Sequence, residues 1–266
     1  MHRCAARSSH EDASLSAHYN LGASQSTLER NPVSDRATRM SSVRGEHRVM
    51  LPMPWRLDGD PSDPTAPLVV GLHGMGMDED FFAILLQKLF VLPFRFLLPR
   101  GPYPVEVGSE HRIGASWYAY DGDQDRFRIE LERTERIILE LLRSVESAHG
   151  LRPRTRVLYG FSQGGYCGSY LALRNPDLFG GMVIAGARVK TELLEMEMKE
   201  AAARGFRVLL CHGKRDSSVS PEAAARSRDA LAKAGVDVTF ETFEAGHSVN
   251  RAQIDVVARW LERHFA

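Results

Sequence analysis

The residues best suited to catalyse a reaction lie around Ser162, in the pattern Gly160-x-Ser162-x-Gly164. A short apolar run at 157–159 precedes the pattern, and a helix-compatible stretch at 166–174 follows it. A serine between a strand and a helix lies on a sharp turn, where a base can reach its hydroxyl. The N-terminus of the following helix then faces any negative charge that develops nearby. The pattern therefore predicts that Ser162 is a nucleophile.

A serine nucleophile needs a base, and the base needs a group that orients it. Of ten histidines, His247 is the one placed after an expected strand and before the last expected helix. That position is beyond the carboxyl edge of a parallel sheet, where ligands bind. We therefore predict that His247 is the base, although a surface-loop histidine is the alternative.

The orienting acid should follow another strand, and Asp216 does so in the segment His212-Gly-Lys-Arg-Asp216. The order Ser162, Asp216, His247 is the order used by enzymes with this strand-to-helix serine. Asp216 is also a good turn residue, and Asp255 in the last expected helix is a rival.

A tetrahedral oxyanion needs two hydrogen-bond donors, usually backbone N–H groups. We expect one from Gln163, at the start of the helix after the serine. The second is expected from Met75 in His73-Gly-Met-Gly76, whose glycines let the backbone approach a substrate. The alternative is that these glycines only turn the chain.

An apolar acyl site is expected near the serine. Its candidate residues are Trp117, Tyr118 and Phe161. No cluster of cations that would select phosphate accompanies them. The sequence has no His-Glu-x-x-His, no paired cysteine spacing and no Gly-Lys-Ser phosphate loop, so we expect neither a metal nor a cofactor.

The elements that must position these residues alternate between strand and helix patterns. Such alternation predicts an α/β fold, with a mostly parallel central sheet and helices on both faces. Strands are expected at 48–51, 68–72, 94–98, 156–159, 182–185, 206–211 and 236–243. Helices are expected at 80–90, 127–146, 166–174, 191–204, 221–234 and 248–264. Residues 52–67 and 101–125 are expected to be loops.

Composition limits the kinds of partner, the cellular location and the number of domains that we expect. The 34 basic and 34 acidic residues balance, so no overall charge favours nucleic acid. No apolar run approaches the ~18 residues of a membrane span, and the polar N-terminus predicts a cytoplasmic protein. Residues 1–46 are rich in serine and poor in large apolar side chains, which predicts a disordered tail before one domain at 47–266. Nothing in the sequence defines an oligomeric state.

Four segments together carry a resemblance to a known family. They are Leu72-His-Gly-Met-Gly76, Gly160-Phe-Ser-Gln-Gly-Gly165, His212-Gly-Lys-Arg-Asp216 and Gly246-His247. They resemble the phospholipase/carboxylesterase family of α/β-hydrolases, which includes the acyl-protein thioesterases. The resemblance implies the α/β-hydrolase fold, a Ser162–Asp216–His247 triad and an oxyanion hole from Met75 and Gln163.

These observations predict a serine hydrolase that cleaves carboxylic esters or thioesters through an acyl-enzyme on Ser162. The expected partner is a small ester or acyl thioester. Two alternatives stay open: a dipeptidyl-type serine peptidase with the same triad, and a non-catalytic binding protein with a hydrolase fold.

Overall fold

The computed structural model describes Gly45, His47, residues 51–108 and residues 112–266. The chain separates into two units, Met1–Arg48 and Val49–Ala266, and the second contains all the elements given below. The predicted tail at 1–46, except for Gly45, lies outside the described residues. The predicted strand at 48–51 lies outside them too, except for Leu51, which belongs to no strand.

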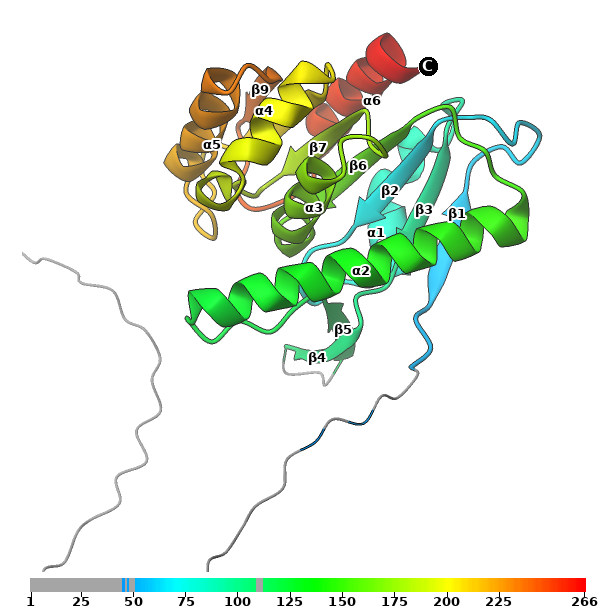
Figure 1. The fold of residues 1–266 in the computed structure, drawn as a ribbon, viewed down its shortest axis with the longest axis horizontal. Coiled ribbons are helices and arrows are strands. Elements are labelled where there is room, and N and C mark those ends of the chain that lie inside the picture. Colours follow the sequence, from blue (N-terminus) through cyan, green and yellow to red (C-terminus); the bar gives the residue numbers. More distant parts are fainter. Residues whose placement is uncertain (1–44, 46, 48–50, 109–111) are drawn as a thin grey trace, which may run out of the picture. The chain divides into compact units, whose positions relative to one another are not determined.

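A seven-stranded sheet forms the centre, in the order β1-β3-β2-β6-β7-β8-β9 (Figure 1). Only β1 runs antiparallel to its neighbour, β3, and every other pair is parallel. Strands β2, β3 and β7 are buried along their whole length, as expected for parallel strands covered on both faces. The strands are β1 (Trp55–Asp58), β2 (Leu68–Leu72), β3 (Arg95–Pro99), β6 (Arg156–Phe161), β7 (Gly181–Ala185), β8 (Arg207–Gly213) and β9 (Asp237–Phe243).

Helices cover both faces of this sheet, which confirms the predicted α/β class (Figure 1). One face packs against α2 (Gln124–His149), α3 (Gln163–Arg174), α4 (Glu195–Ala203) and α5 (Pro221–Lys233). The other packs against α1 (Glu79–Leu86) and α6 (Arg251–Phe265). Two short 3-10 helices, η1 (Gln87–Leu89) and η2 (Thr191–Leu193), complete the helical segments of the described residues.

The order of the strands fixes where a site can form. The chain runs from β1 at the edge of the sheet to β2, returns to β3 between these two strands, and then crosses to β6 and the later strands on the other side of β2. Chain segments therefore diverge between the carboxyl ends of β2 and β6, the switch point where α/β sheets bind ligands. The loop after β2 contains His73 and Met75, and the turn after β6 contains Ser162.

Two predicted loops contain strands, so those predictions were wrong. Strand β1 lies within 52–67. Pro52 and Pro54 favoured a loop prediction there, although proline is tolerated just before an edge strand. Strands β4 (Tyr103–Val107) and β5 (Arg112–Ser116) form an antiparallel hairpin within 101–125. Proline and glycine inside these short runs weaken the strand pattern, and the hairpin is stabilised by contacts remote in sequence.

Candidate active site

Ser162 forms the turn between β6 and α3. With φ 52° and ψ −119°, it is the only non-glycine residue with a positive φ among the residues described. Such a conformation costs about 1–3 kcal/mol and persists only where the surroundings hold it. The Ser162 N–H donates to Ala185 O (2.9 Å), and the Ser162 carbonyl accepts from Gly165 N–H (2.9 Å). The neighbouring strand and the helix therefore hold this turn from both sides.

Gly164 lets α3 approach the end of β2. A Cβ at this position would overlap the carbonyl oxygens of Leu72 and His73. We expect Gly164→Ala to lower the free energy of unfolding by about 2–3 kcal/mol, because the added carbon meets rigid backbone. Gly246→Ala is the matched control, since its Cβ would have ordinary contact with Arg215 O at 3.6 Å. Urea titrations measure both, and equal stability of the two variants would contradict this interpretation.

Three predicted residues from different strand ends meet at one point. Ser162 follows β6, Asp216 lies beyond β8, and His247 lies beyond β9. His247 Nε2 is 2.8 Å from Ser162 Oγ, and His247 Nδ1 is 2.8 Å from Asp216 Oδ2. An Nδ1–H that donates to the carboxylate leaves the Nε2 lone pair for the serine proton. This arrangement is able to make Ser162 nucleophilic.

Backbone groups hold the Asp216 carboxylate in place. Asp216 Oδ1 accepts hydrogen bonds from the N–H groups of Ser218 and Val219, both at 2.9 Å. Burial acts to raise the pKa of Asp216, but the Val219 N–H, the His247 ring and the Ser218 N–H outweigh it, so the pKa lies below its ordinary value. The carboxylate is therefore ionised beside the imidazole at neutral pH.

The cations next to Asp216 in sequence do not compete for its charge. Lys214 Nζ donates to Glu244 Oε1 at 2.6 Å, and Arg215 Nη1 lies 3.5 Å from Glu244 Oε2. The rival acid, Asp255, lies exposed on α6. These placements favour Asp216 as the group that orients His247.

A second histidine faces Asp216, which the sequence did not indicate. His212 is buried at the end of β8, one residue beyond the strand expected at 206–211. Its Nε2 lies 2.9 Å from Val219 O and 3.4 Å from Asp216 Oδ2. His212 thereby supports the loop that presents the carboxylate.

Two predicted backbone donors lie close to Ser162 in the fold, Gln163 directly after it and Met75 beside Gly74. In the part of the chain that the structure describes, the N–H groups of Met75 and Gln163 donate to no other protein group. Gln163 is the first residue of α3, where an N–H has no acceptor within the helix. Gly74, next to Met75, packs so closely that a Cβ there would lie 3.4 Å from Ser162 Cβ. Two N–H groups without a protein acceptor are the type of donor that an oxyanion requires.

The β4–β5 hairpin holds the loop that carries Met75. Gly76 N–H donates to Ala115 O (2.8 Å), and Ala115 N–H donates to Met77 O (2.8 Å). Because Ala115 lies in β5, the hairpin that sequence reasoning missed fixes the backbone of one predicted donor.

His73, which is buried, also stabilises the loop that carries Met75. Its buried ring accepts the Gly101 N–H at Nε2 (2.9 Å), so Nδ1 carries the proton and donates to Gly74 O (2.8 Å). Its carbonyl accepts the indole N–H of Trp117 (2.8 Å). The contact at Nε2 requires a neutral imidazole, and burial lowers the pKa of His73 to about 4.

This burial makes stability depend on pH. In the unfolded chain the pKa of His73 is near 6.5, so below that pH the unfolded state binds a proton that the folded state excludes. We expect the contribution to be complete above about pH 6.5 and to be lost as the pH falls toward 4, by about 3 kcal/mol. Urea unfolding from pH 7 to 4.5 should show a smaller loss in His73→Gln than in the natural protein. The exposed His149→Gln is the control; identical pH dependence in all three would contradict the assignment.

The Gln163 side chain ties α3 to the segment after β5, a role that its place in the motif did not reveal. Gln163 Oε1 accepts the Trp117 N–H (2.9 Å), and Gln163 Nε2 donates to Ser116 Oγ (2.8 Å) and Tyr118 O (3.1 Å). The residue that offers a backbone donor is therefore fixed by its own side chain.

The three predicted substrate-binding residues have different positions. Trp117 is fully buried, so its indole supports His73 and lines no open surface; that part of the prediction needs correction. Phe161 is buried beside the imidazole of His247, with ring centroids 5.1 Å apart. Tyr118 is partly buried and lines a pocket next to α3. The sequence placed Trp117 in a loop and could not reveal its long-range hydrogen bond.

The described ranges contain no group of three or more His, Cys, Asp or Glu side chains that could hold a metal ion. No helix within them has the length and apolar character needed to cross a membrane. Cys167 and Cys211 are buried and free, as small core residues would be.

Comparison with known proteins identifies the family. The model of the phospholipase/carboxylesterase family matches residues 59–265, and the chain belongs to this family. Acyl-protein thioesterase 1 of Gibberella zeae is 29% identical over 211 residues, which cover 73% of this chain and 89% of that protein. A probable inactive carboxylesterase of Oryza sativa subsp. japonica is 24% identical over 212 residues, covering 75% and 85%.

Solved structures agree on the fold. The crystal structure of Zea mays acyl-protein thioesterase 2 aligns with a TM-score of 0.64 and 21% identity, over 80% of this chain and 99% of that chain. At this identity the likeness shows the fold alone, which is the α/β-hydrolase fold that the sequence motifs predicted.

Proposed function

We propose that this protein is a serine hydrolase that cleaves carboxylic esters or thioesters through an acyl-enzyme on Ser162. The observation that carries the proposal is the continuous hydrogen-bonded line from Asp216 through His247 to Ser162, with 2.8 Å at each imidazole nitrogen. Membership of the phospholipase/carboxylesterase family supports the same reaction class.

In the proposed first half-reaction, Ser162 Oγ attacks the substrate carbonyl carbon while His247 Nε2 takes the hydroxyl proton. The imidazolium that forms is stabilised by the Asp216 carboxylate. Collapse of the tetrahedral intermediate breaks the bond to the alcohol or thiol, which receives the proton from His247. The acyl group remains on Ser162 as an ester.

In the second half-reaction, water attacks this ester and His247 takes its proton. The intermediate then expels Ser162 Oγ, which is reprotonated, and the carboxylic acid leaves. Backbone N–H groups of Met75 and Gln163 donate to the oxyanion in both intermediates. We place the acyl group near Phe161 and Tyr118, with Trp117 acting from the core through His73.

Two other functions are less well supported. The name of the rice relative shows that family members can be described as inactive, but here all three positions of the line are occupied and joined by hydrogen bonds. A dipeptidyl-type peptidase would use the same triad on an amide bond, and no described feature favours capture of a free amine.

A matched substrate series tests the proposed reaction. Octanoyl esters, thioesters and amides of comparable leaving groups should give measurable kcat/KM values for the ester or the thioester. We expect amide turnover to be negligible by comparison, because an amine leaves far less readily. Faster cleavage of the amide would favour the peptidase, and no cleavage of any member would favour the binding protein.

A further inference from the structure

A pocket of about 200 Å³ opens beside α3. Tyr166, in its wall, lies one helical turn beyond Ser162, and its N–H donates to Ser162 O (3.2 Å). The backbone carbonyl of Tyr118, which also lines the pocket, accepts from the Gln163 side chain. Two residues that line the pocket are therefore hydrogen-bonded to Ser162 or Gln163. It is lined by Tyr118, Tyr120, Phe127, Tyr166, Arg188 and Lys190.

The loop after β7 brings two cations into this pocket. The loop begins at Gly186, where a Cβ would lie 3.3 Å from Cε1 of His247, the proposed base. Two residues farther on is Arg188, and Lys190 follows. One short segment thus starts against the catalytic imidazole and ends with positive charge in the pocket wall.

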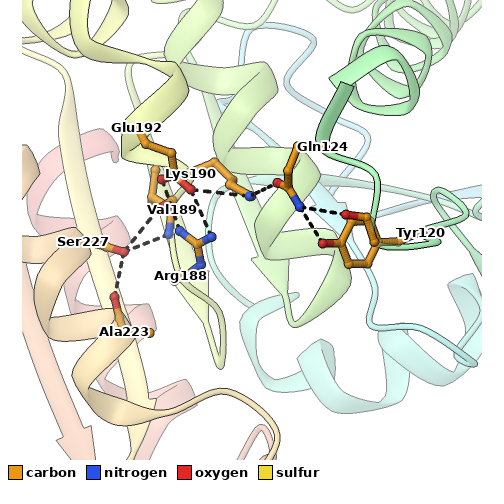
Figure 2. Close-up of polar contacts among 9 residues, drawn as sticks. Tyr120, Gln124, Arg188, Val189, Lys190, Glu192, Ala223 and Ser227 are labelled. Carbon is orange, nitrogen blue, oxygen red and sulfur yellow. Dashed lines mark hydrogen bonds and ion pairs between the residues drawn. The ribbon is translucent and has the colours of Figure 1, made fainter. Parts of the chain in front are cut away.

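Lys190 is held there in spite of burial. Its side chain is 9% exposed, and its Nζ lies 2.9 Å from Gln124 Oε1, 3.4 Å from Glu192 Oε1 and 5.2 Å from the Phe127 ring centroid. Gln124 in turn donates to the hydroxyl of Tyr120 at 2.6 Å. Figure 2 shows this chain of contacts, which joins the start of α2 to the loop after β7. Placing a lysine out of water is costly unless its charge is paired and hydrogen-bonded, and Gln124 and Glu192 supply these contacts here.

Arg188 adds a second positive charge. Its Nη1 and Nη2 donate to Glu192 at 3.2 and 3.0 Å, and its guanidinium lies 5.8 Å from the Tyr166 ring centroid. The backbone between the two cations is anchored to α5, because Val189 N–H donates to Ser227 Oγ at 3.0 Å (Figure 2). The loop is therefore fixed on both sides.

The charges in this cluster do not cancel. Arg188 and Lys190 share one carboxylate, that of Glu192, which leaves one net positive charge. Glu192 is also the only carboxylate that lines the described part of the neighbouring depression; Arg226 lines that depression and not the pocket. Arginine has five N–H donors and an ammonium has three, so donors remain for a ligand.

We propose that this pocket binds a carboxylate group carried by the substrate, so that the enzyme prefers esters with an anionic end. The proposal rests on the serine hydrolase function proposed above. One net positive charge matches a monoanion, whereas a phosphate dianion would leave a negative charge unmatched in a partly buried site. The aromatic walls take the hydrocarbon that joins this carboxylate to the reacting ester.

Paired esters test the proposal. The mono-p-nitrophenyl ester of suberic acid is compared with its methyl-capped neutral form, and 4-acetoxybenzoate with its methyl ester, so that the carboxylate lies in the acyl part or in the alcohol part. We expect kcat/KM of the anionic member to exceed that of the neutral member about tenfold in at least one pair. Equal values in both pairs would overturn the proposal.

Charge variants of opposite sign sharpen the test. Lys190→Met should lower the anionic-to-neutral ratio about tenfold, and Glu192→Gln should raise it several-fold, because the net charge changes in opposite directions. Lys199→Met, on the exposed side of α4, is the control and should leave the ratio unchanged. Should Lys190→Met fail to fold, Arg188→Met replaces it, because this side chain is 30% exposed. The assignment would be refuted if the anionic-to-neutral ratio did not fall in Lys190→Met and rise in Glu192→Gln.

Failure of the pocket and failure of the proposed reaction are distinguishable. Hydrolysis of both members of each pair at equal rates would reject carboxylate binding by the pocket and would still support the serine hydrolase. If no ester is cleaved, calorimetry of suberate binding to Ser162→Ala decides the pocket separately. We expect binding that weakens about tenfold when Lys190→Met is added; no difference between the two proteins would overturn the pocket.

Discussion

Replacing Ser162 by alanine is expected to lower kcat/KM for p-nitrophenyl esters at least about ten-thousand-fold, because the reaction loses the atom that forms the acyl-enzyme. In this variant only a water molecule could serve as the nucleophile. His247 and the backbone donors would remain, but no described residue would position that water where the serine hydroxyl was. The strain in the turn is expected to change little, since alanine tolerates φ 52° about as poorly as serine. Folding should be retained, because no side-chain hydrogen bond of Ser162 caps α3.

The measurement compares purified Ser162→Ala with Ser144→Ala, a serine exposed on α2. Circular dichroism melting verifies that both are folded. Ser144→Ala should keep the activity of the natural protein. Turnover by Ser162→Ala within a factor of ten of the control would show that the hydrolysis, if any, uses another group.

Replacing Asp216 by asparagine is expected to lower kcat about a thousand- to ten-thousand-fold with little change in KM. The asparagine carbonyl would take the place of Oδ1, which accepts the N–H groups of Ser218 and Val219. The amide NH2 must then face His247 Nδ1, where it can only donate. The imidazole responds by carrying its proton on Nε2, and it can no longer accept the proton of Ser162.

The control for this prediction is Asp255→Asn, which changes the rival carboxylate exposed on α6. Both variants are assayed with the same ester, and their melting temperatures are compared. A large loss in Asp255→Asn with full activity in Asp216→Asn would reverse the assignment of the acid.

The parts of the site that could be predicted from sequence are those governed by local rules. Ser162 was found because a strand, two glycines and a helix surround it within a dozen residues. His247 and Asp216 were found because each follows a strand of a parallel sheet, and parallel strands end at a common edge. The regular alternation of strand and helix patterns predicted the α/β fold for the same reason.

The parts that were missed depend on contacts between distant segments. The β4–β5 hairpin is held against the Met75 loop by Ala115, and its own strands contain Pro104 and Gly114, which are weak strand formers. Trp117 appeared to be a loop aromatic, but its indole N–H reaches back to His73.

The cations of the pocket were missed for a related reason. Lys190 directly precedes the helix expected at 191–204, and only folding places it beside Gln124, 66 positions earlier in the chain. No periodic pattern in the sequence predicts a contact between residues so far apart in the chain. Long-range placement, more than residue type, decides which charged groups become part of a site.

A fluorophosphonate probe tests the central claim most directly, because it forms a covalent bond only with an activated serine. After labelling of the whole protein, peptide mass spectrometry should locate the adduct on Ser162 alone, and prior incubation with ester substrate should slow its formation. Denatured protein should not react. A probe that leaves Ser162 unmodified in the folded protein, or that labels a different serine, would contradict the proposed role of the Asp216–His247–Ser162 line.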